Sequence, residues 1–266
     1  MLKLGTMNNE EIEEIGPERI SFATFLLRLI AGCAGGVAGG VVLLLVFMLV
    51  SSVFEPLATL NEQITYISPI FTFILVTMIF VSTTIGNIAS TWLMGLVEKG
   101  RYQKISSAIY QIFIISLIIF IVLSPVYFVT GAANPAVTAY VVALHIILAA
   151  QVSALILEIV SNYRYSLVGV YGVTFSVLVS AGILFSMASF IENPQILLFI
   201  ALPVVWGSIA FVGGIVNNIY VWLAKTYDKD FLAIDTAYGE DYGEEVEEEE
   251  EPAAKDEEGG DFLRHN

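Results

Sequence analysis

Six long apolar stretches dominate the pattern of hydrophobic and polar positions along the chain. A helix needs about 20 mostly apolar residues to cross the roughly 30 Å hydrocarbon core of a bilayer. Unbroken apolar runs of this length are too long for barrel strands, and the two-residue alternation of a membrane barrel is absent. The pattern therefore predicts an all-α, polytopic integral membrane protein with six transmembrane helices. The predicted spans cover residues 29–53, 67–95, 106–129, 136–160, 167–191 and 196–222.

The spans are evenly spaced, and a tyrosine follows each even-numbered one. Tyr102, Tyr165 and Tyr227 lie 63 and 62 residues apart. This spacing fits three helical hairpins of similar length, although six evenly spaced helices also produce it without ancestry. A true repeat would favour a transporter, because transporter sites often lie at repeat interfaces.

Orientation follows from the basic residues, which all fall on one side of the predicted spans. Lys and Arg near span ends are retained on the cytoplasmic side. The three loops on the opposite side, 54–66, 130–135 and 192–195, contain no basic residue. The distribution predicts a protein of the cytoplasmic (plasma) membrane with both termini in the cytoplasm. The eleven basic residues are Lys3, Arg19, Arg28, Lys99, Arg101, Lys104, Arg164, Lys225, Lys229, Lys255 and Arg264.

Composition separates the bundle from its ends. Apolar residues make up 57% of the chain, but the formal charge is −15. Residues 226–266 hold sixteen Asp and Glu against three Lys and Arg, so that they carry −13 of this charge. Such a segment buries too little apolar surface to offset its ordering entropy. Residues 226–266 are predicted to be a disordered acidic cytoplasmic tail, which either solvates the protein or docks a basic cytoplasmic protein.

The N-terminal segment, residues 1–27, is also acidic and is predicted to contain a short interfacial helix. It lacks the basic start and short apolar core of a secretory signal, so no cleavage is expected. Ser21 is a candidate N-cap for the first long helix. Arg28, at the start of the bundle that covers residues 28–225, is expected to extend its charge to the membrane surface. The lone cysteine, Cys33, is expected to be a small packed thiol.

Small residues recur every four positions in several spans. In lipid, helices associate through close backbone contact at such residues, because no hydrophobic driving force brings them together. The pattern predicts tight helix packing, either within the chain or in a homo-oligomer. The positions on these faces are Gly32, Gly36 and Gly40 in the first span, and Gly172, Ser176 and Ser180 in the fifth.

Polar residues in the cytoplasmic halves of the spans form a candidate polar inner cluster. Each must find a partner or face water. They either hold helices together by hydrogen bonds or line a vestibule open to the cytoplasm. Glu158 is expected to reach interfacial water, so that its carboxylate needs no partner. The candidates are Asn87, Gln111, Gln151, Glu158 and Asn217.

Residues that carry common enzymatic chemistry are missing. No His-Glu-x-x-His pair, Gly-x-Ser-x-Gly elbow or phosphate-binding loop occurs, and no span contains an Asp. His145 is the only histidine in a span, and a partner on a helix backbone or a serine is expected for it. Pro203 is expected to kink the sixth helix. No catalytic site, metal or cofactor is predicted, and the few scattered basic residues do not indicate nucleic acid.

Two functions fit these features. The first is a non-enzymatic multi-pass membrane scaffold or assembly protein that presents its acidic tail to a partner. The alternative is a small-solute channel or transporter with a polar vestibule facing the cytoplasm. A continuous polar cavity through the bundle would favour the alternative, whereas a dry core would favour the scaffold.

Overall fold

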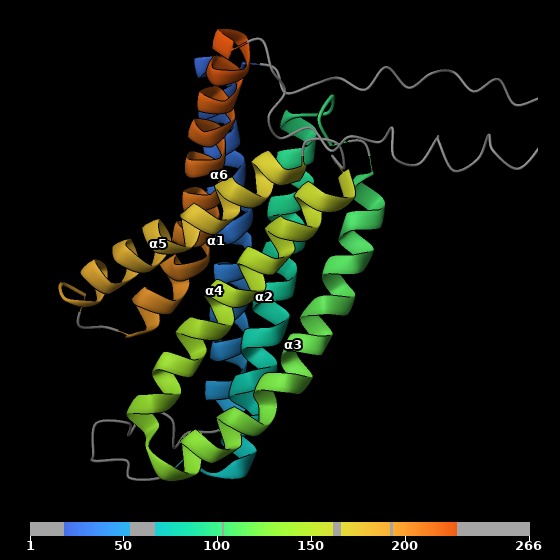
Figure 1. The fold of residues 1–266 in the computed structure, drawn as a ribbon. Coiled ribbons are helices and arrows are strands. Elements are labelled where there is room, and N and C mark those ends of the chain that lie inside the picture. The colour runs from blue at the N-terminus through green and yellow to red at the C-terminus, as the bar shows by residue number, and fades with distance from the viewer. Residues whose placement is uncertain (1–18, 54–66, 103, 162–165, 192–193, 228–266) are drawn as a thin grey trace, which may run out of the picture. The chain divides into compact units, whose positions relative to one another are not determined.

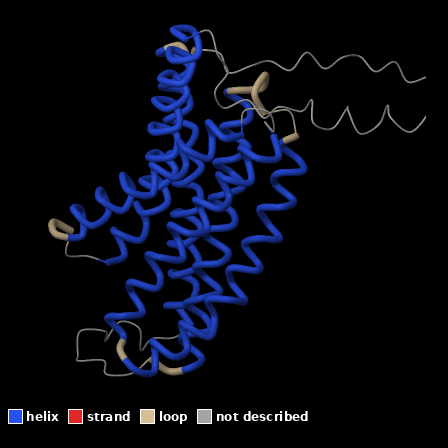
Figure 2. Tube along the Cα trace, in the orientation of Figure 1, coloured by secondary structure: helices blue, strands red, loops and turns tan. Residues whose placement is uncertain are grey.

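The computed structural model describes residues 19–53, 67–102, 104–161, 166–191 and 194–227, and the regular elements among them are all helices (Figure 2). The predicted interfacial helix and the acidic tail from residue 228 onward lie outside these residues, whereas the first two residues of the predicted tail, 226 and 227, belong to the last helix. The chain divides into two compact units, Met1–Ala233 and Ile234–Asn266, and the helices belong to the first. They are α1 (Phe22–Val53), α2 (Pro69–Val97), α3 (Ile105–Ala133), α4 (Pro135–Ser161), α5 (Ser166–Ala188) and α6 (Pro194–Tyr227).

The prediction of six helices is confirmed, because each of these six is long and apolar enough to cross a membrane. The largest difference in boundaries is at α1, which begins seven residues before the predicted span. Ser21 caps it, as predicted: the Thr24 N–H donates to Ser21 Oγ at 3.1 Å. The predicted apolar span began after Arg28, because a charged side chain lowers the local hydropathy, whereas the helix itself begins at Phe22, directly after its predicted cap.

Helix α1 packs between α2 and α6, and its glycines lie in both contacts (Figure 1). A Cβ added at Gly36 would lie 2.5 Å from the Pro203 nitrogen of α6, and one at Gly32 would lie 2.8 Å from the Trp206 carbonyl oxygen. On the other side, Ser82 Oγ of α2 donates to the Gly39 carbonyl oxygen at 2.7 Å. The backbones therefore approach closely on both sides of α1.

The most extensive of the remaining contacts join α5 to α6, α3 to α4 and α2 to α3, and smaller ones join α4 to α5, α2 and α6, and α2 to α6. Gly172 of α5 meets Gly213 of α6, where an added Cβ would lie 2.8 Å from the Gly213 Cα. Helix α6 continues through Pro203, and its first turns run in a different direction from the rest (Figure 1). Proline bends a helix because its ring excludes the carbonyl one turn earlier.

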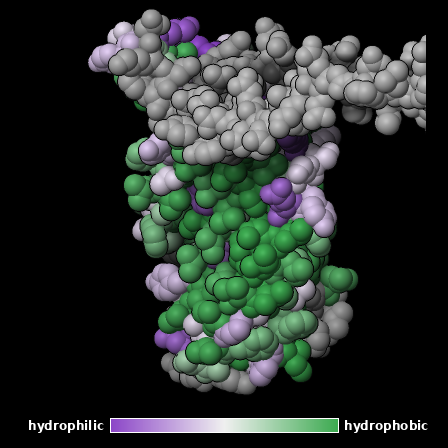
Figure 3. Space-filling view, turned by 45° about the vertical axis from the view of Figure 1, so that its right-hand side comes forward, coloured by the Kyte–Doolittle hydropathy of each residue, from purple (hydrophilic) through white to green (hydrophobic). Residues whose placement is uncertain are grey.

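Hydrophobic side chains cover much of the described surface between the two ends of the bundle, as one face shows in Figure 3. Every described Arg, Lys and Glu lies at one end, where α1, α3 and α5 begin and α2, α4 and α6 end. We call this the charged end. The candidate site is built there.

Candidate functional site

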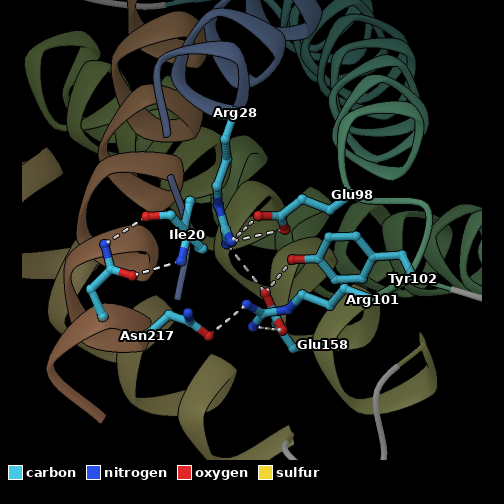
Figure 4. Close-up of polar contacts among 8 residues, drawn as sticks. Ile20, Arg28, Glu98, Arg101, Tyr102, Glu158 and Asn217 are labelled. Atoms are coloured by element: carbon cyan, nitrogen blue, oxygen red, sulfur yellow. Dashed lines mark hydrogen bonds and ion pairs between the residues drawn. The ribbon is translucent and has the colours of Figure 1, made fainter. Parts of the chain in front are cut away.

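A buried network of ion pairs joins four parts of the chain at the charged end (Figure 4). Arg28 Nη1 of α1 lies 3.0 Å from Glu98 Oε2, at the C-terminus of α2. Arg101 Nη2, from the turn before α3, lies 2.7 Å from Glu158 Oε2 of α4. A longer contact of 3.5 Å between Arg28 Nη2 and Glu158 Oε1 connects the two pairs.

Two uncharged side chains extend this network. The Tyr102 hydroxyl donates to Glu158 Oε1 at 2.7 Å. Arg101 Nη1 donates to Asn217 Oδ1 of α6 at 3.1 Å. The network therefore contacts α1, α2, α4 and α6 and the turn between α2 and α3.

The charges are both buried and balanced. Side-chain exposure is 1% for Arg28, 3% for Glu158, 7% for Glu98 and 15% for Arg101. Two guanidinium groups thus face two carboxylates with little access to water. Desolvation of ions costs several kcal/mol each, so such groups persist only with close partners. The expectations that Arg28 extends to the surface and that Glu158 needs no partner are wrong, because each is enclosed by helices that supply the opposite charge.

A tight turn aligns three members of the network. The N–H groups of both Arg101 and Tyr102 donate to the Glu98 carbonyl oxygen at 3.0 Å, so that the chain folds back directly after α2. Burial alone would lower the pKa of the Arg101 guanidinium, but the carboxylates of Glu158 and Glu98 outweigh it and raise this pKa. Burial also raises the pKa of the Tyr102 phenol, which favours the neutral form that donates to Glu158.

Two glycines leave space for the buried charges. A Cβ on Gly169 of α5 would lie 2.5 Å from the Glu158 Cδ, and one on Gly213 of α6 would lie 2.9 Å from Arg28 Nη2. Both charged side chains therefore occupy volume that a larger residue would fill. These glycines connect the packing of α5 and α6 to the network.

A second polar contact joins the two ends of the helical region. Asn218 of α6 accepts a hydrogen bond from the Ile20 N–H at 2.8 Å and donates to the Ile20 carbonyl oxygen at 3.3 Å. The Asn218 side-chain amide thus pairs with both the N–H and the carbonyl oxygen of Ile20. It fixes the chain just before α1 against α6.

The five residues of the candidate polar inner cluster are not brought together as one group. Glu158 and Asn217 lie in the ion-pair network. Asn87 accepts a hydrogen bond from Trp206 Nε1 at 2.9 Å, and Gln151 accepts one from Ser176 Oγ at 3.0 Å. These two pairs join α2 to α6 and α4 to α5.

Gln111 is the exception among the five. Its side chain is exposed on α3, where Nε2 lies 3.5 Å from Ser107 Oγ on the same helix. Its predicted depth was similar to that of the other four residues, but depth alone does not determine whether a side chain faces the interior or the surface of the bundle.

His145 is buried, but its partner is neither a backbone group nor a serine. The Tyr127 hydroxyl of α3 lies 3.2 Å from His145 Nδ1. The expected partner was wrong because α3 brings a buried phenol to the histidine. Within the described residues, no three His, Cys, Asp or Glu side chains lie close enough together to hold a metal ion.

Sequence reasoning missed four members of the network: Arg28, Glu98, Arg101 and Tyr102. One signal was present. Glu158 was the only acidic residue in a predicted span, and Arg28 bordered another span on the same side. Opposite charges at similar depth in apolar helices favour a pair.

Comparison with known proteins adds no assignment to this geometry. The chain matches no protein-family model, and no curated protein or solved structure is significantly similar to it.

Proposed function

We propose that this chain is an integral membrane protein with six transmembrane helices and both termini in the cytoplasm, and that it acts as a non-enzymatic scaffold or assembly protein. The observation that carries the proposal is the ion-pair network at the charged end. Its charges are used to connect helices.

The bonding of Glu158 supports a scaffold more than a solute pathway. Its two oxygens are engaged by three donor groups, from Arg28, Arg101 and Tyr102, and its side chain is 3% exposed. A carboxylate that lines a water-filled vestibule would keep free lone pairs for solvent or solute. Here they are occupied by neighbouring parts of the chain.

The alternative, a small-solute channel or transporter, has a specific observation in its favour. Asn87 Nδ2, Thr91 Oγ1 and Gln151 Nε2 are buried and make no hydrogen bond to another described residue. Such groups cost about 1–3 kcal/mol each when they are left unpaired, so water or a polar solute would stabilise them. Flux measurements in proteoliposomes test this alternative. A polar solute whose passage is lost in Gln151→Leu, with the fold intact, would favour transport over the scaffold.

The membrane location and its orientation have a direct test. In a Cys33→Ser background, single cysteines are placed at Ala132, in the last turn of α3 at the end opposite the charged end, and at Ser106, in the first turn of α3 at the charged end. Both positions are exposed. In intact cells, the cysteine at 132 should react with an impermeant maleimide and the one at 106 only after lysis. Recovery of the protein in the soluble fraction, or the reverse labelling, would contradict the proposal.

As a scaffold, the protein would present residues 226–266 to a basic cytoplasmic protein. The support is the sequence, which places a net charge of −13 in the 41 residues 226–266, all but the first two of which follow α6. A chain without residues 240–266 should keep its thermal stability and lose a partner that elutes with increasing salt, because salt screens exposed charges. The same set of bound proteins with and without the tail would contradict a docking role.

A further inference from the structure

One face of α6 carries two cavities that differ in chemistry. The first, about 510 Å³, lies at the charged end and is lined by two basic residues, Arg19 and Lys225, together with Asn218 and Trp222. The second, about 540 Å³, lies farther along α6 and is almost entirely apolar. Helices α1 and α5 form its other walls, through residues such as Cys33 and Ile183.

Both cavities open on the same side of α6. The lining residues follow steps of four and three along the helix, which keeps them on one face. Lys225 and Phe211 are fourteen residues apart, or about 21 Å at 1.5 Å per residue. One leaflet of a bilayer, with its headgroups, is about 20–22 Å thick. The apolar groove begins at Phe211 and continues away from Lys225 as far as Ile200, so the terminal part of an acyl chain reaches its near end when the phosphate lies at Lys225. The lining residues on this face are Val204, Ser208, Phe211, Ile215, Asn218, Trp222 and Lys225.

The basic cavity has the charge that a phosphate requires. Arg19 and Lys225 are exposed, and neither forms an ion pair with a described residue. The contact between Asn218 and Ile20 holds the chain beside Arg19 against α6. Trp222, 64% exposed, borders the cavity, and tryptophan favours the headgroup level of a membrane.

We infer that this face of α6 binds one anionic phospholipid. The inference rests on the membrane location proposed above. The phosphate lies between the Arg19 guanidinium and the Lys225 ammonium, which supply charge-assisted hydrogen bonds. An acyl chain lies along Ile215 and Phe211, and its terminal part enters the near end of the groove between α1, α5 and α6. The apolar groove accounts for lipid binding as such, and the basic pair accounts for a preference for anionic headgroups.

The charge of the site is tested with the full chain in detergent, by native mass spectrometry with phosphatidylglycerol and phosphatidylcholine of matched chains. The intact protein should hold one phosphatidylglycerol more tightly than any phosphatidylcholine. Loss of each basic residue should weaken phosphatidylglycerol binding about five-fold, so the double variant Arg19→Gln with Lys225→Gln should bind this lipid about 20–30-fold more weakly. Phosphatidylcholine carries the same phosphate together with a choline cation, so its binding should weaken much less. The matched control neutralises Lys99 and Lys104, two exposed basic residues that do not line either cavity. It should leave the binding of both lipids unchanged.

The groove is tested separately. Ile183→Trp fills it from α5 and should reduce binding of both lipids, whereas Ile118→Trp on the outer surface of α3 should not. Equal binding of the two lipids by the intact protein would overturn the anionic site. An equal loss of phosphatidylglycerol binding in the Arg19/Lys225 and the Lys99/Lys104 double variants would also overturn it. Neither result would affect the membrane location, which cysteine labelling reports independently.

A photoreactive residue at Ile219 identifies the occupant. A crosslink to phospholipid in native membranes supports the inference. A crosslink to residues 228–266 of the same chain would overturn it, because the acidic tail would then neutralise the basic cavity.

Discussion

Replacing Glu158 with glutamine tests whether the ion-pair network holds the bundle together. Glutamine keeps the length of the side chain but supplies one acceptor oxygen in place of two. In the native protein, Arg101 Nη2 lies 2.7 Å from Glu158 Oε2, and the Tyr102 hydroxyl lies 2.7 Å from Glu158 Oε1. The glutamine amide N–H groups would face one of these two donors and could not accept its hydrogen bond. The change also leaves two buried guanidinium groups with the single carboxylate of Glu98. Removal of one partner from a buried ion pair costs about 3–5 kcal/mol, and we expect a loss of this size in the free energy of unfolding.

The assay is reversible unfolding in mixed micelles, followed by the fluorescence of Trp206, which is fully buried and bonded to Asn87. A double-mutant cycle with Arg101→Gln isolates the pair. The double variant restores the charge balance, so the two changes should couple by about 1–3 kcal/mol. Lys104→Gln, which removes an exposed charge outside the network, should cost less than about 0.5 kcal/mol. Additive effects, or a Glu158→Gln protein within about 1 kcal/mol of the original, would refute the role of the network.

Two further predictions concern glycines. Gly36→Leu should dissociate or destabilise the bundle by several kcal/mol, because its side chain would enter the α6 backbone; Gly182→Leu, with no atom within 4 Å of its added Cβ, is the matched control and should melt at the original temperature. Gly169→Ala should lower the free energy of unfolding by about 1–3 kcal/mol, because the added methyl group overpacks against the Glu158 carboxylate. This cost should largely disappear in a Glu158→Ala background. The same cost in that background would show that Gly169 does not act through Glu158.

Hydropathy was sufficient to predict the helices, but it carries no information about which helices become neighbours. Each span could be located from its own residues, because burial in lipid or protein requires a long apolar run wherever the helix lies. The predicted first span began at residue 29, seven residues inside α1, because hydropathy is read along the chain alone. A window average treats Arg28 as surface, although its charge is cancelled by Glu98, seventy residues away.

The site was predicted only in part because partners depend on helix rotation and order. Glu158 was singled out correctly as unusual in an apolar span. Its partner Arg101, however, was interpreted from the sequence as one of the basic loop residues that set the orientation in the membrane. Gln111 shows the opposite error, since depth suggested a shared cluster while the helix face directs its side chain outward.

The spacing of the network along the chain also bears on how the protein is synthesised. Its charges appear in the order Arg28, Glu98, Arg101 and Glu158. The net charge of the members synthesised so far is therefore +1 after Arg28, 0 after Glu98, +1 after Arg101 and 0 after Glu158. If helices insert in order of synthesis, a chain that ends after α3 has one guanidinium without a carboxylate, and the balance returns only when α4 is in place. Asn217 then joins from α6 as the last member. Completion of the site therefore coincides with completion of the bundle, which gives a protease or chaperone a chemical means of distinguishing a finished protein from an arrested one.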